Sequence, residues 1–144
     1  MSEIITNKLT GKTAAGNVTI TGEGGTGTMQ LQQGVAKAWI NYKQAATFET
    51  RDSLNISSVY DYGSGLADTN YTNNFNNDDY AAAGAACRQG TNSISAYWTF
   101  ATRSTVVYST SSTSWTSGYN GGQSSVLSAL DCDLNIVTVH GDLA

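Results

Sequence analysis

The sequence predicts an all-β fold, an antiparallel β-sandwich (jelly-roll-like) with a short N-terminal β arm, and three observations support this prediction. First, the chain is rich in Thr, Ser, Asn and Gly and only 12% of its residues are charged, yet it contains 3 Trp, 8 Tyr and 3 Phe. A disordered chain of that polarity would be highly charged and poor in aromatic residues. Second, apolar and polar residues alternate with period two in several short runs, as in half-buried strands. Third, turn residues and no long amphipathic helical pattern separate these runs, which favours a sandwich.

Size and charge limit the possible functions. The 144 residues suit one domain with a short appendage. With 7 Lys and Arg against 11 Asp and Glu, the formal net charge is −4. This charge argues against a nucleic-acid partner, because such binding requires clustered cations. No run approaches the roughly 20 apolar residues that span a bilayer, and residues 1–8 lack the basic start and apolar core of a signal peptide. We therefore expect no membrane insertion and no export by that route.

Residues 1–34 are expected to form a separate arm for attachment or oligomerisation, and residues 35–144 the β-sandwich domain. In the arm, Val18 and Ile20 alternate with threonines, which predicts a strand, and a glycine-dense stretch follows at residues 22–27. Residues 28–33 could form one helical turn capped by Thr28 and closed by Gly34. Such a short unit cannot bury much apolar surface on its own.

The sandwich is expected to begin with a strand at residues 35–42. Its even-numbered positions from Ala36 to Tyr42 share one apolar face, and Trp39 places an aromatic ring on the opposite face, so we expect both faces to be covered. The alternation continues through Leu54 and Ile56, and the glycine turn at residues 63–65 leads into a hairpin strand that returns through Tyr71 and Phe75. Further strands are expected at residues 81–86, 95–100, 105–108 and 134–139, with a loop at residues 109–122.

Catalytic and cofactor motifs are weak in this sequence. The spacing Gly22-x-Gly24-x-x-Gly27 matches the dinucleotide fingerprint, but no βαβ unit and no ribose-binding acid follow it. His140 is the one imidazole, so a serine hydrolase triad has a single candidate base. The adjacent carboxylates Asp78 and Asp79 lie in a loop-like segment, where turn formation is the simpler role. Asp131 and Asp133 would point the same way at a strand start and could share a cation, but a solvated strand entrance is the favoured interpretation. We therefore predict no catalytic residue, no cofactor and no metal site.

The two cysteines, Cys87 and Cys132, lie far apart in the sequence and match no CxxC metal or redox spacing. Two small buried thiols are the favoured interpretation, with a disulfide as the alternative.

Two large aromatic residues, Trp115 and Tyr119, fall in the expected loop at residues 109–122, among Ser, Thr and Gly neighbours that cannot build a core around them. Together with Asn120 as a polar contact, they are the predicted binding surface. Stacking on a sugar and burial against a neighbouring subunit are both open, and so is a loop that folds back over its own sandwich. Trp98, within an apolar alternating run, is expected to pack in the core.

Three consecutive motifs resemble a module of tail-fibre-like virion proteins from tailed bacteriophages, of the marine phage type. The motifs are Ala36-Lys37-Ala38-Trp39-Ile40-Asn41-Tyr42, Arg51-Asp52-Ser53-Leu54-Asn55-Ile56-Ser57-Ser58 and Asp61-Tyr62-Gly63-Ser64-Gly65. The resemblance covers roughly residues 28–84, and residues after Arg88 lie outside it. Because residues 66–70 follow the glycine turn where the module passes directly into its strand, we expect a longer hairpin tip.

The resemblance implies a non-enzymatic virion component, assembled in the host cytoplasm, usually homotrimeric and in contact with other virion proteins. The favoured function is a tail fibre or receptor-binding tip that attaches to the host surface, through a host glycan if the exposed aromatic residues bind one. A capsid decoration or assembly protein is the alternative. A cell-surface glycan hydrolase is the third.

Overall fold

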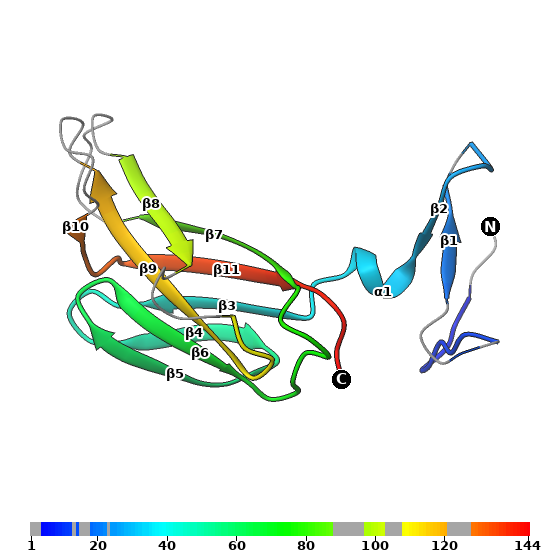
Figure 1. Ribbon diagram of the computed structural model, residues 1–144, viewed down its shortest axis with the longest axis horizontal. Coiled ribbons are helices and arrows are strands. Elements are labelled where there is room, and N and C mark those ends of the chain that lie inside the picture. Colours follow the sequence, from blue (N-terminus) through cyan, green and yellow to red (C-terminus); the bar gives the residue numbers. More distant parts are fainter. Residues whose placement is uncertain are drawn as a thin grey trace. The chain divides into compact units, whose positions relative to one another are not determined.

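The computed structural model describes residues 4–12, 14, 18–22, 24–87, 97–102, 108–120 and 128–144, and in these ranges all side chains except those of residues 97–99 and 120. The chain divides into two compact units, Met1–Val35 and Ala36–Ala144. Their elements are labelled in Figure 1. The boundary lies one residue from the one drawn on the sequence.

The first unit contains one small hairpin and one helical turn. Strand β1 (Thr19–Thr21) pairs antiparallel with β2 (Thr28–Gln30), so that Ile20 lies directly opposite Met29. The glycine-dense stretch closes the hairpin, with the Gly22 amide donating to the Gly27 carbonyl at 2.7 Å. Helix α1 (Leu31–Gly34) follows. The predicted cap at Thr28 is wrong, because residues 28–30 are held as a strand by β1 and the helical turn begins only at Leu31.

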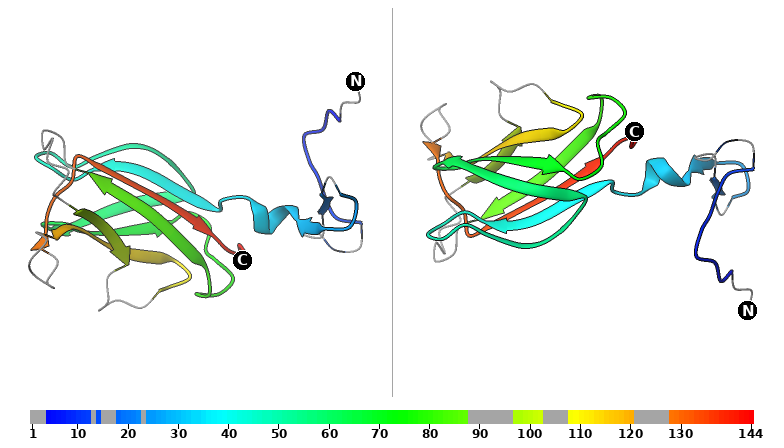
Figure 2. Two further views of the ribbon diagram at one scale, coloured as in Figure 1. Left: turned by 90° about the horizontal axis from the view of Figure 1, so that it is seen from above. Right: turned by 90° about the horizontal axis from the view of Figure 1, so that it is seen from below.

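The second unit is an antiparallel β-sandwich, which confirms the predicted fold class. One sheet, here the β3 sheet, has the order β4-β3-β11-β7, formed by Glu49–Leu54, Ala38–Lys43, Leu134–His140 and Ala81–Cys87. The other, the β6 sheet, contains β5 (Ile56–Gly63), β6 (Leu66–Tyr71), β8 (Tyr97–Thr102), β9 (Ser112–Asn120) and β10 (Ser128–Ala129). Figures 1 and 2 show the two sheets of this unit packed against each other.

Strand β9 organises the β6 sheet because three strands pair with it. Trp115 and Thr116 pair with β6 and with β8, and Gly118 and Tyr119 pair with β8 and with β10. Strands β6 and β10 therefore follow one another along one edge of β9, and β8 occupies the other edge.

The core lies between the two sheets and follows the period-two pattern. From the β3 sheet it takes Ile40 and Tyr42 of β3 and Val137 and Val139 of β11, each 2% exposed or less. From the β6 sheet it takes alternate residues of β6 and β9: Ala67, Thr69, Tyr71, Thr113, Trp115 and Ser117. The predicted apolar face of residues 36–42 and the predicted strands at 81–86 and 134–139 are confirmed.

A cluster of aromatic rings closes one part of the core. Tyr80 packs against Tyr71, Phe75 and Tyr108, with ring centroids 4.6 to 6.1 Å apart. The hydroxyl groups of Tyr71 and Tyr80 both share a hydrogen bond with the Thr113 hydroxyl. The buried phenols are thereby satisfied, as buried polar groups require.

The chain changes sheet at Asn55, so the expected continuous strand through Leu54 and Ile56 is two strands, β4 and β5. Asn55 has φ 58°, a left-handed conformation that Asn tolerates better than most residues. Its side-chain oxygen accepts from the Asn73 amide at 2.7 Å, and its side-chain nitrogen donates to the Asn73 carbonyl. These bonds fix the corner between the sheets.

The expected longer hairpin tip is wrong. Strand β6 starts at Leu66, so residues 66–70 are the returning strand itself and the tip consists only of the glycine turn. Of the expected strand at residues 105–108, residues 105–107 lie outside the described residues, and Tyr108 lies outside the strands.

Candidate functional site

Trp115, the predicted anchor of a binding loop, lies in the core instead. It is 2% exposed, its indole Nε1 donates to the Thr69 hydroxyl at 2.9 Å, and its ring stacks on Phe100 with centroids 5.3 Å apart. The predicted loop is wrong over residues 112–120, which form β9. The physical reason is that the small hydroxyl side chains around Trp115 are satisfied within the sandwich: Ser117, for example, donates to the Leu130 carbonyl at 3.0 Å.

Tyr119 and Asn120, the other two predicted contact residues, lie at the end of β9. Tyr119 is half-buried and pairs through its backbone with Trp98 and Ser128. Asn120 pairs with Tyr97, and its side chain lies outside the described ones, as does that of Trp98. With Trp115 in the core, the three predicted residues do not form one exposed contact surface.

The glycine-turn motif, Asp61 to Gly65, has a structural role, because its hydrogen bonds connect separate segments of the sandwich. The Asp61 carboxylate accepts from the Gly63 amide and from the buried Gln44 side chain, both at 3.0 Å. The Gly65 amide donates to the Asp131 carboxylate at 2.7 Å. Gly65 has φ 68°, and a Cβ there would collide with the Ser117 carbonyl oxygen and lie 2.5 Å from the Leu130 amide nitrogen. The motif thus ties β5, β6 and the segment before β11 together.

Two residues considered for catalysis, His140 and Asp131, each contact another residue of the sandwich. His140, at the end of β11, lies 3.4 Å from the Thr138 hydroxyl. The Asp131 carboxylate accepts a hydrogen bond from the Gly65 amide. Within the described residues, no group of three or more His, Cys, Asp or Glu side chains is placed to hold a metal ion.

Cys87 and Cys132 are free thiols, of which Cys132 is buried and Cys87 is exposed. The prediction of unpaired thiols therefore agrees with the structure, whereas the predicted burial of Cys87 is wrong because β7 ends there at the sheet surface. Burial raises the pKa of the Cys132 thiol above its ordinary value. A hydrogen bond with the Ser117 hydroxyl lowers this pKa, and the nearby Cys87, Asp131 and Asp133 raise it. Cys132 is therefore a protonated, unreactive thiol at neutral pH.

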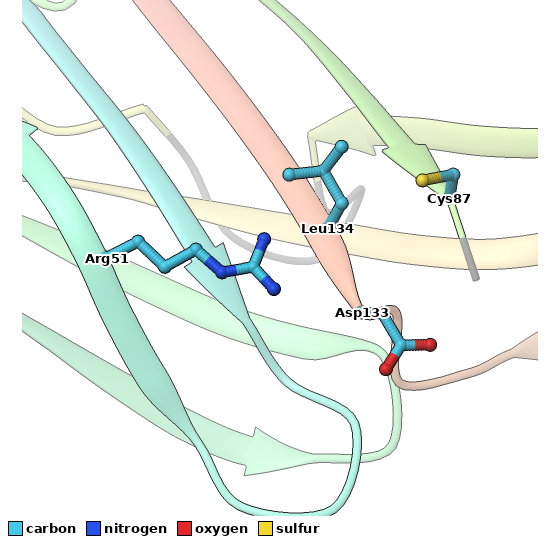
Figure 3. Close-up of a pocket in the computed structure, with 4 residues that line it drawn as sticks. All are labelled: Arg51, Cys87, Asp133 and Leu134. Atoms are coloured by element: carbon cyan, nitrogen blue, oxygen red, sulfur yellow. The ribbon is translucent and has the colours of Figure 1, made fainter. Parts of the chain in front are cut away.

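A small open pocket lies on the outer side of the β3 sheet, lined by Arg51, Cys87, Asp133 and Leu134, with a volume of about 240 Å³. Figure 3 shows Arg51 reaching from β4 toward β11, which carries Leu134, with Asp133 just before that strand. Arg51 is the extra residue of a bulge between β4 and β3, which redirects its side chain. The lining thus combines a guanidinium, a thiol and a carboxylate around the Leu134 side chain.

The outer face of the β6 sheet carries two exposed aromatic residues that sequence reasoning placed only in a hairpin. Tyr60 and Tyr62 of β5 are 58% and 54% exposed, and their rings meet edge to face with centroids 4.4 Å apart. The signal was the alternation Tyr60-Asp61-Tyr62, which puts both rings on one face of a strand. The candidate binding surface of the sandwich is this tyrosine pair, on the face opposite the core that buries Trp115.

No described helix has the length and apolar character needed to cross a membrane. Comparison of the sequence with family models and with curated proteins, and of the chain with solved structures, gives no match.

Proposed function

We propose that this chain is a non-enzymatic structural component of a tailed-bacteriophage particle, a tail fibre or receptor-binding tip that attaches to the host surface as a homotrimer. The resemblance of residues 28–84 to the tail-fibre-like module supports the proposal, and the residues of that module have structural roles here. Asn55 forms the corner between the sheets, and Asp61, Gly63 and Gly65 form the joint at the hairpin. A module whose characteristic residues hold the fold in this way suits a scaffold for display, which is what an adhesion tip requires.

The observation that carries the proposal is the state of the first unit. No described residue of Met1–Val35 is buried. Its apolar side chains are open to solvent: Ile4 and Ile5 are each 86% exposed, Leu9 58%, Met29 50%, Val35 47% and Ile20 44%. An isolated two-stranded hairpin is marginally stable in water at best, so these side chains need a partner surface.

Copies of the same chain are the partner that always accompanies such a unit at equal concentration. Association of arms around a symmetry axis lets each Ile20 and Met29 pair pack on its equivalents, which gives a closed interface. Attachment to another virion protein would use the remaining apolar residues of the same arm.

A trimer also provides the mechanism of adhesion. Three weak sites displayed on one particle become strong collectively, because binding of the first raises the effective concentration of the others. A small sandwich whose single site binds weakly can therefore serve as an adhesin.

Imaging of the intact particle with the chain located by a specific antibody tests the proposal. We expect the label on the tail or its fibres, and we expect excess purified protein to block adsorption of particles to host cells. Label on the capsid shell with unchanged adsorption would overturn the proposal in favour of a decoration protein. Release of sugars from cell-surface polysaccharide would overturn it in favour of a hydrolase.

A further inference from the structure

The tyrosine pair does not stand alone on its face of the sandwich. Residues paired across antiparallel strands point to the same side, and Tyr60 on β5 pairs with Asp68 on β6, which pairs with Ser114 on β9. The neighbouring row runs from Ser58 through Asn70 to Ser112. The face therefore combines two aromatic rings at the outer strand β5 with a ladder of carboxylate, amide and hydroxyl groups beside them.

One atom of this ladder is unsatisfied. Asp68 Oδ1 is shielded from solvent and accepts no hydrogen bond from the described residues. A carboxylate oxygen without a donor costs free energy. Because Asp68 as a residue is only partly buried, a turn of its side chain toward the surface would let this oxygen accept a hydroxyl or amide proton from a ligand. In the next row the Asn70 side chain already donates to the Ser58 hydroxyl at 3.0 Å, which holds the amide in place beside the rings.

The exposed aromatic surface is large for an edge strand. Both tyrosines are more than half exposed, and their edge-to-face contact joins the two rings into one aromatic surface. Tyrosine side chains offer contact area at little cost in side-chain entropy.

Charge selects the class of ligand. Asp68 is the charged group among the paired residues of this face, and the whole chain has a formal net charge of −4. An acidic polysaccharide or a phosphate would be repelled here. A neutral molecule with many hydroxyl donors and an apolar ring face fits both the carboxylate and the tyrosines.

We propose that the outer face of β5 and β6 binds a neutral pyranose saccharide, with Tyr60 and Tyr62 stacking on the sugar ring and Asp68 accepting hydrogen bonds from its hydroxyl groups. The inference rests on the proposed adhesive function and gives it a site and a ligand class. It differs from the site predicted on the sequence, which placed the contact at Trp115.

The first experiment titrates the full-length, isotope-labelled protein with neutral oligosaccharides of glucose, of galactose and of N-acetylglucosamine, and with polygalacturonate as the acidic comparison. We expect amide resonances of β5 and β6 to shift with at least one neutral probe and not with polygalacturonate. No shift on these strands with any neutral probe would overturn the site, as would stronger shifts with the acidic probe. Either result leaves the position of the chain in the particle, and hence the proposed function, to be decided by imaging.

Variants then assign the roles. The double variant Tyr60→Ala, Tyr62→Ala should weaken the binding seen in the titration at least tenfold, whereas Tyr60→Phe, Tyr62→Phe should retain most of it, because the rings remain. Asp68→Asn should weaken binding severalfold, since an amide oxygen is a poorer acceptor than a carboxylate. Leu54→Ala, Ile136→Ala on the outer face of the β3 sheet is the matched control, because these residues are 48% and 43% exposed.

Self-association on the same face is the competing explanation, and light scattering distinguishes it. All variants should remain folded with one cooperative melting transition and keep the oligomeric state of the parent. If the Tyr60→Ala, Tyr62→Ala variant is dissociated relative to the parent, or the control variant loses binding equally, the proposal is overturned.

Discussion

The arm and the sandwich share a period-two alternation of apolar residues, but only the sandwich buries the apolar side chains. In β3, alternate residues such as Ile40 and Tyr42 face a second sheet and are 1% exposed. In the hairpin of the arm, Ile20 and Met29 face each other across two strands but remain 44% and 50% exposed. A period-two pattern therefore specifies which side chains share a face, and only a second layer buries them. The sandwich supplies that layer from its own chain, whereas no described residue of the arm is buried.

The largest expected effect comes from removing the centre of the sandwich. Trp115→Ala should lower the free energy of unfolding by about 3–5 kcal/mol, because it leaves a cavity beside Phe100 and deprives the Thr69 hydroxyl of its donor. Chemical denaturation of the full chain measures the loss. Ile20→Ala in the arm is the matched comparison and should leave the midpoint of the sandwich unchanged; an equal loss there would mean that the two units fold as one.

A smaller effect is expected at the second tryptophan. Trp39 lies on β3 on the face opposite Ile40 and Tyr42, as the sequence predicts, but it is only half-buried, between Leu54 of β4 and Thr138 of β11. Trp39→Ala should therefore cost about 1–2 kcal/mol, less than the 3–5 kcal/mol of a fully buried aromatic residue. A loss as large as that of Trp115→Ala, by the same denaturation assay, would show that the outer face of the β3 sheet is covered in solution.

The corner between the sheets provides a backbone test of similar size. Asn55→Ala should destabilise the sandwich by about 1–3 kcal/mol, since alanine is strained at φ 58° and loses the bonds to Asn73. Asn55→Gly avoids the strain but still loses the bonds to Asn73. Its unfolding midpoint should therefore fall between those of Asn55→Ala and the parent. Equal midpoints for the glycine and alanine variants would show that the conformation at residue 55 is not left-handed.

Local patterns predicted most of the strands but not the boundaries set by tertiary contacts. The alternation at residues 36–42 and 134–139 marks strands with buried alternate residues, whereas the small-residue run at 81–86 belongs to an outer strand, paired with β11, that has no buried residue. Gly84 explains the last of these: a Cβ there would collide with the Phe100 ring and lie 2.9 Å from the Ile136 carbonyl oxygen. The sheet change at Asn55 was invisible, because a single left-handed residue leaves the alternation of its neighbours intact.

The candidate site was mispredicted for a definite reason. Ser and Thr around Trp115 indicated a solvated loop, but in an antiparallel sheet their hydroxyl groups are satisfied by carbonyls and phenols of neighbouring strands, as at Thr113 and Ser117. Conversely, Tyr60 and Tyr62 alternate like core residues. The face of Tyr60 is set by its pairing with Asp68, a long-range register that the sequence alone does not contain, and the Tyr62 ring lies against the Tyr60 ring.

Alkaline pH should separate the buried phenols from the exposed ones. Burial raises the pKa of Tyr42 well above its ordinary value of about 10, and the nearby Cys132 and Asp61 raise it further. At pH values above about 10 the unfolded state loses a proton that the folded state keeps, so this contribution to stability is present below pH 10 and is lost as pH rises toward the folded-state pKa. In Tyr42→Phe, the fall in unfolding free energy above pH 10 should be shallower by about 1.4 kcal/mol per pH unit. Denaturation series from pH 8 upward measure this slope, and an unchanged slope would mean that Tyr42 is accessible to hydroxide.

The smallest effect on the sandwich, and the sharpest test of the comparison, is expected from the arm. Ile20→Ser, Met29→Ser keeps the hairpin length but replaces the two facing apolar side chains with hydroxyls that water can solvate. If copies of the chain supply the missing layer, light scattering should show a trimer for the parent and a monomer for the variant, with the same melting temperature for the sandwich in both after allowance for protein concentration. Thr19→Ser, Thr21→Ser, exposed positions of the same strand, is the control and should remain trimeric. A parent that is monomeric at micromolar concentration would refute the shared layer.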